Sequence, residues 1–154
     1  MFANHQLAAA SQIIAQHDAT ERAMRRSHRA ARRTQRRFRR TLPGFSSHDT
    51  AILEGLGTTI RVPVGTRIAT QGAPGREAFV LTRGQLTVAR DGTTITKLVP
   101  GQLAGEMAVL TRKPRNADVV ATTEAELVVL TPPELRASLE RIPVLAAQVI
   151  ARSA

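Results

Sequence analysis

Three residues in the segment GEMAVLTRKPRNA, residues 105–117, could together bind a phosphate that is joined to a sugar. Gly105 precedes a short helix-like apolar run, and the unpaired backbone N–H groups at a helix N-terminus favour anions. Arg115 could add a planar guanidinium that matches two phosphate oxygens. Glu106 cannot favour a phosphate by charge, but it could accept a hydrogen bond from a ribose hydroxyl. Singly, each residue is more often a turn glycine, a solvated acid or a surface cation. Jointly, the spacing predicts a pocket for a nucleotide monophosphate.

Short strands must position this segment, because from Thr58 onward the apolar residues alternate with a period of two. Turn signals separate the strands, and Asp91–Gly92 is a strong hairpin signal. Many short strands at this spacing are typical of a compact antiparallel barrel or roll. The expected strands are 58–62, 67–70, 78–82, 85–89, 94–99, 118–122 and 126–131.

Helices are expected on both sides of these strands. Residues 45–56 predict a short helix with Ser46 or Ser47 as its N-cap. Thr131, followed by Pro132, predicts the start of another helix, and a last helix is expected from Pro143. The segment LAGEMAVLTRKP, 103–114, has a helical pattern and interrupts the strands, and residues 106–110 are expected to make about one and a half helical turns.

Composition excludes several kinds of site. The chain has no cysteine, so disulfides, thiolate chemistry and cysteine-based metal sites are excluded. Its four histidines all precede the first expected strand, so neither a metal-binding barrel nor any other metal site is expected. No nucleophile–base pair is apparent, and the protein is therefore not expected to be an enzyme. No apolar run approaches the ~20 residues of a membrane span, and a cytoplasmic location is expected.

Positive charge is concentrated at the N-terminus. Residues 1–42 contain ten arginines and two acids, whereas residues 43–154 contain twelve Lys or Arg and ten acids. Residues 1–42 are therefore expected to form a basic arm, helical or partly disordered, that Pro43–Gly44 ends. Arginines spaced by three or four would share one helical face. They are Arg22, Arg25, Arg26, Arg29, Arg33, Arg36, Arg37 and Arg40.

Several partners remain open for this basic arm. A dense arginine face favours polyanions, of which nucleic acid is the commonest. An acidic protein, an anionic lipid surface and a role as a transit peptide are alternatives, as is a solvated tail with no dedicated partner. The arm has no interleaved aromatic residues, so it gives no support for base stacking.

The segment 104–117 closely resembles the phosphate-binding cassette of the cyclic nucleotide-binding domain family. That family includes catabolite activator proteins, regulatory subunits of cAMP-dependent kinase and cyclic nucleotide-gated channels. Its cassette reads roughly Phe-Gly-Glu, apolar, Ala or Gly, apolar, and later Arg-small-Ala. Here the corresponding letters are AGEMAV (104–109) and RNA (115–117). The resemblance covers about residues 45–142.

The resemblance implies an eight-stranded antiparallel β-roll with flanking helices and a short cassette helix: mainly β with flanking α. It implies Arg115 on the cyclic phosphate and Glu106 on the ribose 2′-OH. The remaining expected ligand neighbours are Gly105, Met107, Ala108, Asn116 and Ala117. The expected domains are the arm (1–42), the roll (43–142) and a truncated C-terminal helix (143–154), forming a standalone unit whose oligomeric state the sequence leaves open.

Two positions depart from the family pattern. Asn116 replaces the usual Ser, Thr or Ala beside the cassette arginine, and Ala104 replaces an aromatic residue. The leading hypothesis is a non-catalytic regulatory sensor that binds cAMP, in preference to cGMP, as its ligand and needs no other cofactor. The alternative is a protein that binds a polyanion, either nucleic acid or an anionic surface, through its arm and uses the roll as a scaffold.

Overall fold

The computed structural model describes residues 42–153. The predicted basic arm, with its eight singled-out arginines, lies outside the described residues except for its last residue, Leu42, and Ala154 lies outside them as well. Its helical form and its partner therefore stay predictions.

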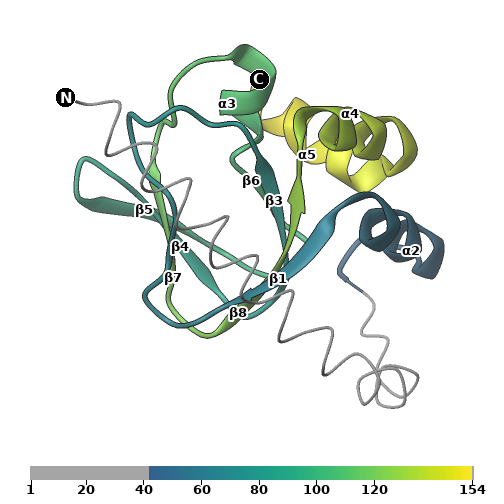
Figure 1. Cartoon of the computed structure of the whole chain (residues 1–154), viewed down its shortest axis with the longest axis horizontal. Coiled ribbons are helices and arrows are strands. Elements are labelled where there is room, and N and C mark those ends of the chain that lie inside the picture. The colour runs from purple at the N-terminus through teal and green to yellow at the C-terminus, as the bar shows by residue number, and fades with distance from the viewer. Residues whose placement is uncertain (1–41, 154) are drawn as a thin grey trace. The chain divides into compact units, whose positions relative to one another are not determined.

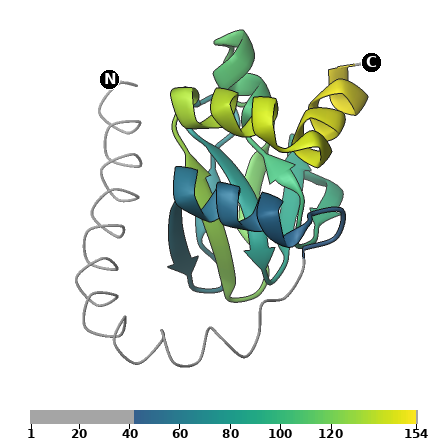
Figure 2. The same cartoon turned by 90° about the vertical axis from the view of Figure 1, so that its right-hand side faces the viewer.

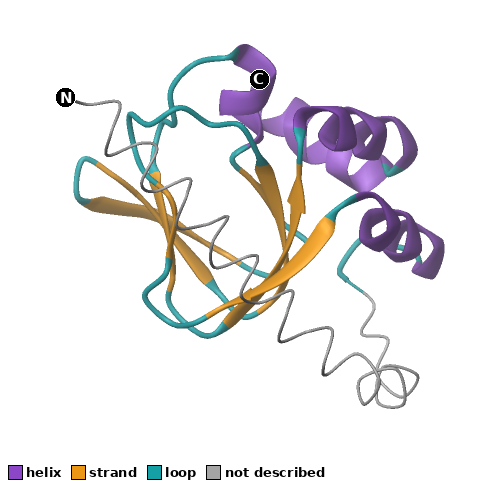
Figure 3. Ribbon diagram, in the orientation of Figure 1, coloured by secondary structure: helices purple, strands orange, loops and turns teal. Residues whose placement is uncertain are grey.

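Eight strands form two antiparallel four-stranded sheets (Figures 1 and 3), which confirms the expected roll. In the first sheet the strand order is β1-β8-β3-β6, and in the second it is β2-β7-β4-β5. The strands are β1 (Thr58–Val62), β2 (Arg67–Ala69), β3 (Ala78–Arg83), β4 (Leu86–Arg90), β5 (Thr93–Leu98), β6 (Leu103–Ala104), β7 (Asp118–Ala121) and β8 (Ala125–Leu130).

The central strands of the first sheet are buried on both faces. In β8, Leu127 and Val129 face the core between the two sheets, whereas Val128 and Leu130 belong to a second core beneath the helices. Successive side chains of a strand point to opposite faces, so an uninterrupted apolar run suits such a strand. The edge strand β5 is exposed from Thr93 to Lys97.

Three helices cover the outer face of the first sheet (Figure 2): α2 (Ser47–Leu56), α4 (Pro132–Arg141) and α5 (Pro143–Ser153). The N-cap of α2 is Ser46, whose hydroxyl and backbone N–H exchange hydrogen bonds with Asp49, both 3.0 Å long. At α4 the backbone N–H of Thr131 donates to Oε2 of Glu134 over 2.8 Å. None of the described helices is long and apolar enough to cross a membrane.

The short helix expected at residues 106–110 is confirmed, but the strand β6 that precedes it was not expected. Leu103 and Ala104 form strand β6, and only Glu106–Thr111 form the helix α3. The pairing is antiparallel to β3, with Ala104 opposite Phe79 and Leu103 opposite Val80. Leu103 and Ala104 are strand residues because they pair with residues more than twenty positions away. The local spacing of apolar residues does not show such pairing.

Candidate functional site

Gly105 connects β6 to α3 in the left-handed backbone region, with φ of 76°. Glycine adopts this conformation without the steric penalty of other residues. A Cβ atom built on Gly105 would also collide with Nη1 of Arg115. The glycine therefore permits the turn and leaves space for the guanidinium.

Arg115 is held in place by both its backbone and its side chain. Its N–H donates to the carbonyl of Ala73, and its carbonyl accepts from the N–H of Gly72, both over 2.8 Å. Its guanidinium donates to the carbonyl of Gly105 over 2.8 Å and to that of Glu77 over 2.7 Å. Strand β7 begins only at Asp118, so Arg115 precedes the strand and pairs with the loop at 72–73 instead.

The guanidinium of Arg115 is a buried cation that still has donors to offer. The residue is only 8% exposed, and its Cζ lies 5.4 Å from the centroid of the Phe79 ring. Burial lowers the pKa of Arg115, while the carboxylates of Glu77 and Glu106 act in the opposite direction. An arginine side chain has five N–H groups. The carbonyls of Gly105 and Glu77 use two of them, and the described residues supply no hydrogen-bond partner for the others.

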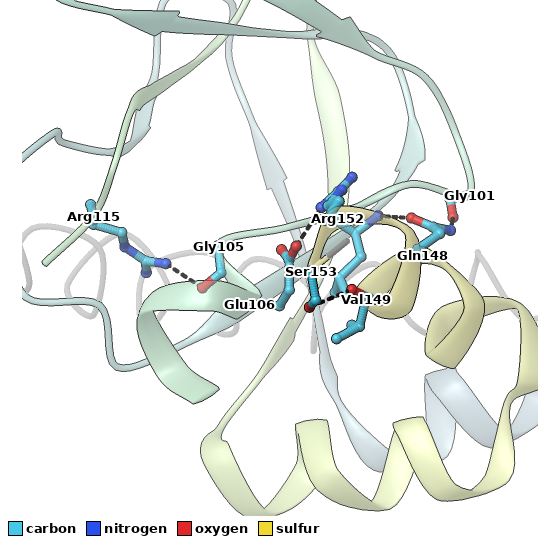
Figure 4. Close-up of polar contacts among 9 residues, drawn as sticks. Gly101, Gly105, Glu106, Arg115, Gln148, Val149, Arg152 and Ser153 are labelled. Carbon is cyan, nitrogen blue, oxygen red and sulfur yellow. Dashed lines mark hydrogen bonds and ion pairs between the residues drawn. The ribbon is translucent and has the colours of Figure 1, made fainter. Parts of the chain in front are cut away.

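Glu106 is the first residue of α3 and is 2% exposed, so it is not a solvated surface acid. Its Oε1 accepts a hydrogen bond of 2.7 Å from Nη1 of Arg152, near the end of α5. Arg115 lies on one side of the start of α3 and Arg152 on the other (Figure 4). The contact with Arg152 orients this buried carboxylate, and its oxygens can accept hydrogen bonds.

A second residue of α5 also anchors the segment before α3. The side-chain amide of Gln148 donates to the carbonyl of Gly101 over 2.8 Å, and its oxygen accepts from the N–H of Leu103 over 2.9 Å. Arg152 additionally donates to the carbonyl of Leu103. The C-terminal helix is therefore attached by polar contacts to the strand and turn that lead into α3.

The other residues expected near a ligand have different exposures. Ala108 and Ala117 are each 6% exposed, Gly105 and Met107 are half-buried, and Asn116 is exposed. The backbone carbonyl of Asn116 accepts a hydrogen bond of 3.0 Å from Nε of Arg90. The seven expected positions thus surround the start of α3 and the turn before β7.

At position 104, where the family pattern has an aromatic residue, the strand partner across the sheet is itself aromatic. Ala104 lies opposite Phe79 in the register of β6 and β3, and both side chains belong to the core between the sheets. The ring of Phe79 lies near the guanidinium of Arg115. An aromatic ring beneath the cassette is thus supplied by β3.

Sequence reasoning missed four residues that shape this site: Gly75, Phe79, Gln148 and Arg152. A Cβ atom on Gly75 would come within 2.5 Å of Cβ of Ala108 and within 2.8 Å of Cζ of Arg115. Gln148 and Arg152 are four residues apart and so share one face of α5. Two polar residues at this spacing in the apolar segment PVLAAQVIA are a signal that could have been found. Gly75 and Phe79 carry no comparable local signal.

The model of the family described as "Cyclic nucleotide-binding domain" matches residues 59–141. The chain is 31% identical over 107 residues to human potassium/sodium hyperpolarization-activated cyclic nucleotide-gated channel 3, and the match covers 68% of this chain. It is 38% identical over 71 residues, 46% of the chain, to the cGMP-dependent protein kinase egl-4 of Caenorhabditis briggsae. Among solved structures, the catabolite activator protein of Thermus thermophilus superposes with a TM-score of 0.60 and 27% identity over 70% of this chain.

These matches cover only part of each relative. The chain spans 14% of the channel, 10% of the kinase and 53% of the catabolite activator protein chain. The similarity therefore concerns one domain of each relative.

Proposed function

Because the chain belongs to the cyclic nucleotide-binding domain family, we propose that it binds a cyclic nucleotide at the start of α3 and acts as a regulatory sensor. In this proposal Arg115 binds the cyclic phosphate and Glu106 accepts a hydrogen bond from the ribose 2′-OH. Backbone groups of Gly105, Met107 and Ala108 lie near phosphate and sugar. Asn116 donates to a phosphate oxygen, and Ala117 leaves room beneath the ligand.

One observation carries this proposal: Glu106 and Arg115 are buried charged residues that flank the same helix start, 2% and 8% exposed. Burying charged groups is costly unless they have partners or a function. The described contacts use two N–H groups of Arg115 and one oxygen of Glu106. The remaining N–H groups and the second carboxylate oxygen are available for a ligand that has both an anionic group and a hydroxyl.

We assign cAMP as the preferred ligand on the basis of the buried surroundings. Among the described residues, the buried polar or charged side chains are Glu106, Arg115 and Ser138. Guanine has more polar groups on its Watson–Crick edge than adenine, and a polar group that is buried without a partner is costly. If the base contacts apolar side chains, adenine is therefore the better fit. The kinase relative is named for cGMP. The preference for cAMP is therefore argued from burial and not from the names of the relatives.

Calorimetric titration of the full chain with cAMP and with cGMP tests the proposal. The wild type is expected to bind cAMP more tightly than cGMP. Arg115→Ala should weaken binding by about 2–5 kcal/mol, because a buried charge-assisted contact to phosphate is lost. Lys97→Ala, which removes an exposed cation of β5, is the matched control and should leave binding unchanged. A wild-type titration without heat of binding for either nucleotide would contradict the proposal.

The proposed sensor does not convert its ligand. Nucleotide incubated with the protein should be recovered unchanged by chromatography, and recovery of the 5′-monophosphate would refute this part of the proposal.

We further propose that the ligand alters the availability of the basic arm to a polyanion, since the dense arginines of the arm favour polyanions. Equal nucleic-acid affinity and equal protease sensitivity of the arm with and without cAMP would exclude this coupling.

A further inference from the structure

A pocket of about 640 Å³ lies beside the proposed cyclic nucleotide site. Its walls are the loop at 74–76, the second half of α3 with the segment that follows it, and the first turns of α4. Neither Glu106 nor Arg115 is among its lining residues, although Gly75 and Ala108 border both places. Pockets of this size commonly hold small ligands.

Four cations line this pocket, and no acid does: Arg76, Arg112, Lys113 and Arg136. All four are exposed, and the described residues form no hydrogen bond or ion pair with any of their side chains. Like charges gathered without a counter-charge repel one another, and a bound anion relieves that repulsion. The rest of the lining carries no polar side chain, because it consists of Gly75, Ala108, Val109 and three prolines.

The backbone of Arg112 gives an independent indication. Arg112 is the C-cap residue of α3 and has φ of 56° and ψ of 25°, in the left-handed region where glycine is favoured. A side chain kept at such a position is a reason to look for a function. Here the strained residue also lines the cationic pocket.

We propose that this pocket binds a small molecule with at least two phosphate groups, such as a nucleoside polyphosphate. Guanidinium groups bind phosphate oxygens in pairs, and three of the four cations are arginines. Four positive charges match a ligand with several negative charges. The apolar residues of the lining suit an uncharged ring. The first N–H groups of α4 contribute little, because Pro132 and Pro133 have none. The site therefore depends on side-chain cations.

The test uses the ¹⁵N-labelled full chain, titrated with tripolyphosphate and with ATP at physiological salt. Site-resolved amide shifts are needed because the arginines of residues 1–42 also attract polyanions. The amides of Gly75, Lys113 and Arg136 should shift and saturate together. In the double variant Arg112→Gly/Arg136→Ala, affinity measured at these amides should fall at least tenfold. Lys97→Ala should change it less than twofold, and saturating cAMP should leave the shifts at these amides intact.

Arg112→Gly also separates binding from folding. Glycine suits the left-handed backbone, so the thermal midpoint of this variant should equal or exceed that of the wild type. Shifts confined to residues 1–42, or equal weakening by Lys97→Ala, would overturn the proposal. Displacement of the ligand from the pocket amides by cAMP would likewise overturn it, because the ligand would then occupy the cyclic nucleotide site. Displacement of tripolyphosphate from these amides by single-stranded DNA at lower phosphate concentration would assign the pocket to nucleic acid and overturn the small-ligand assignment.

Discussion

Arg152 donates a hydrogen bond of 2.7 Å from Nη1 to Oε1 of Glu106, across 46 residues of sequence. The side chain of Glu106 is 3% exposed and that of Arg152 is 34% exposed. The proposed sugar-binding carboxylate is thus paired with the C-terminal helix. A ligand hydroxyl that binds Glu106 must share this carboxylate with Arg152, and this gives α5 a direct contact with the proposed site.

Replacing Arg152 by Ala should destabilise the fold by about 1–3 kcal/mol, because a buried carboxylate then loses its cation. The expected loss lies nearer to about 1 kcal/mol, because Arg152 is partly exposed and solvent screens its attraction to Glu106. Binding of cAMP should weaken as well, since Glu106 loses the partner that orients its carboxylate. Urea denaturation and calorimetry measure the two effects.

The matched control is Arg141→Ala, which removes an exposed arginine of α4 that has no hydrogen bond or ion pair within the described part of the chain. A double-mutant cycle with Glu106→Gln isolates the pair. Additive effects of Glu106→Gln and Arg152→Ala on stability would show that the contact contributes nothing.

Arg115→Lys should behave unlike a conservative change. Lysine keeps the charge but lacks the planar set of donors that reaches the carbonyls of Gly105 and Glu77 together. Loss of one charge-assisted hydrogen bond should lower the free energy of unfolding by about 1.5–3 kcal/mol. Affinity for cAMP should fall, though less than in Arg115→Ala. A lysine variant with wild-type stability and affinity would show that charge alone is required.

Gly75→Ala should weaken cAMP binding although Gly75 is not among the proposed ligand contacts. The added Cβ would come within 2.5 Å of Cβ of Ala108 and 2.8 Å of Cζ of Arg115, so α3 or the guanidinium must move. Gly55→Ala is the control, because a Cβ there meets nothing within 4 Å. Because Gly55 lies inside α2, its replacement by Ala should stabilise the protein by about 0.5–1 kcal/mol. Equal affinities of the two variants would contradict the packing argument.

Ala104→Phe, which restores the aromatic residue of the family pattern, should destabilise this chain. Phe79 is 2% exposed and lies directly opposite Ala104, so a second ring overfills the core at a cost of about 1–3 kcal/mol. The swap Phe79→Ala/Ala104→Phe should recover part of that loss because it restores the total volume. Denaturant melts of the single and double variants measure their free energies of unfolding. A double variant no more stable than Ala104→Phe would contradict the argument from total core volume.

Local sequence patterns predicted most of the strands and the helix starts. Period-two alternation placed β1 at residues 58–62, as in the structure, and placed β2, β3, β4, β5, β7 and β8 within a residue of their observed bounds. Thr131 was identified as an N-cap from residue type and position, and Ser46 was one of two candidates for the other N-cap. These features depend on neighbours within a few residues, which the sequence displays directly. Strand β6 was missed because its two residues are strand only through pairing with β3.

The sequence by itself also identified Glu106 and Arg115 as a pair that could bind a phosphate and a sugar, since their types and spacing within one segment carry that chemistry. Only the tertiary structure decided that both are buried and what holds them. Arg115 depends on the carbonyl of Glu77 and the ring of Phe79, 38 and 36 positions earlier, and Glu106 depends on Arg152. Such contacts exist because the roll closes and α5 packs back on it. No local spacing of residues encodes which distant groups that packing brings together.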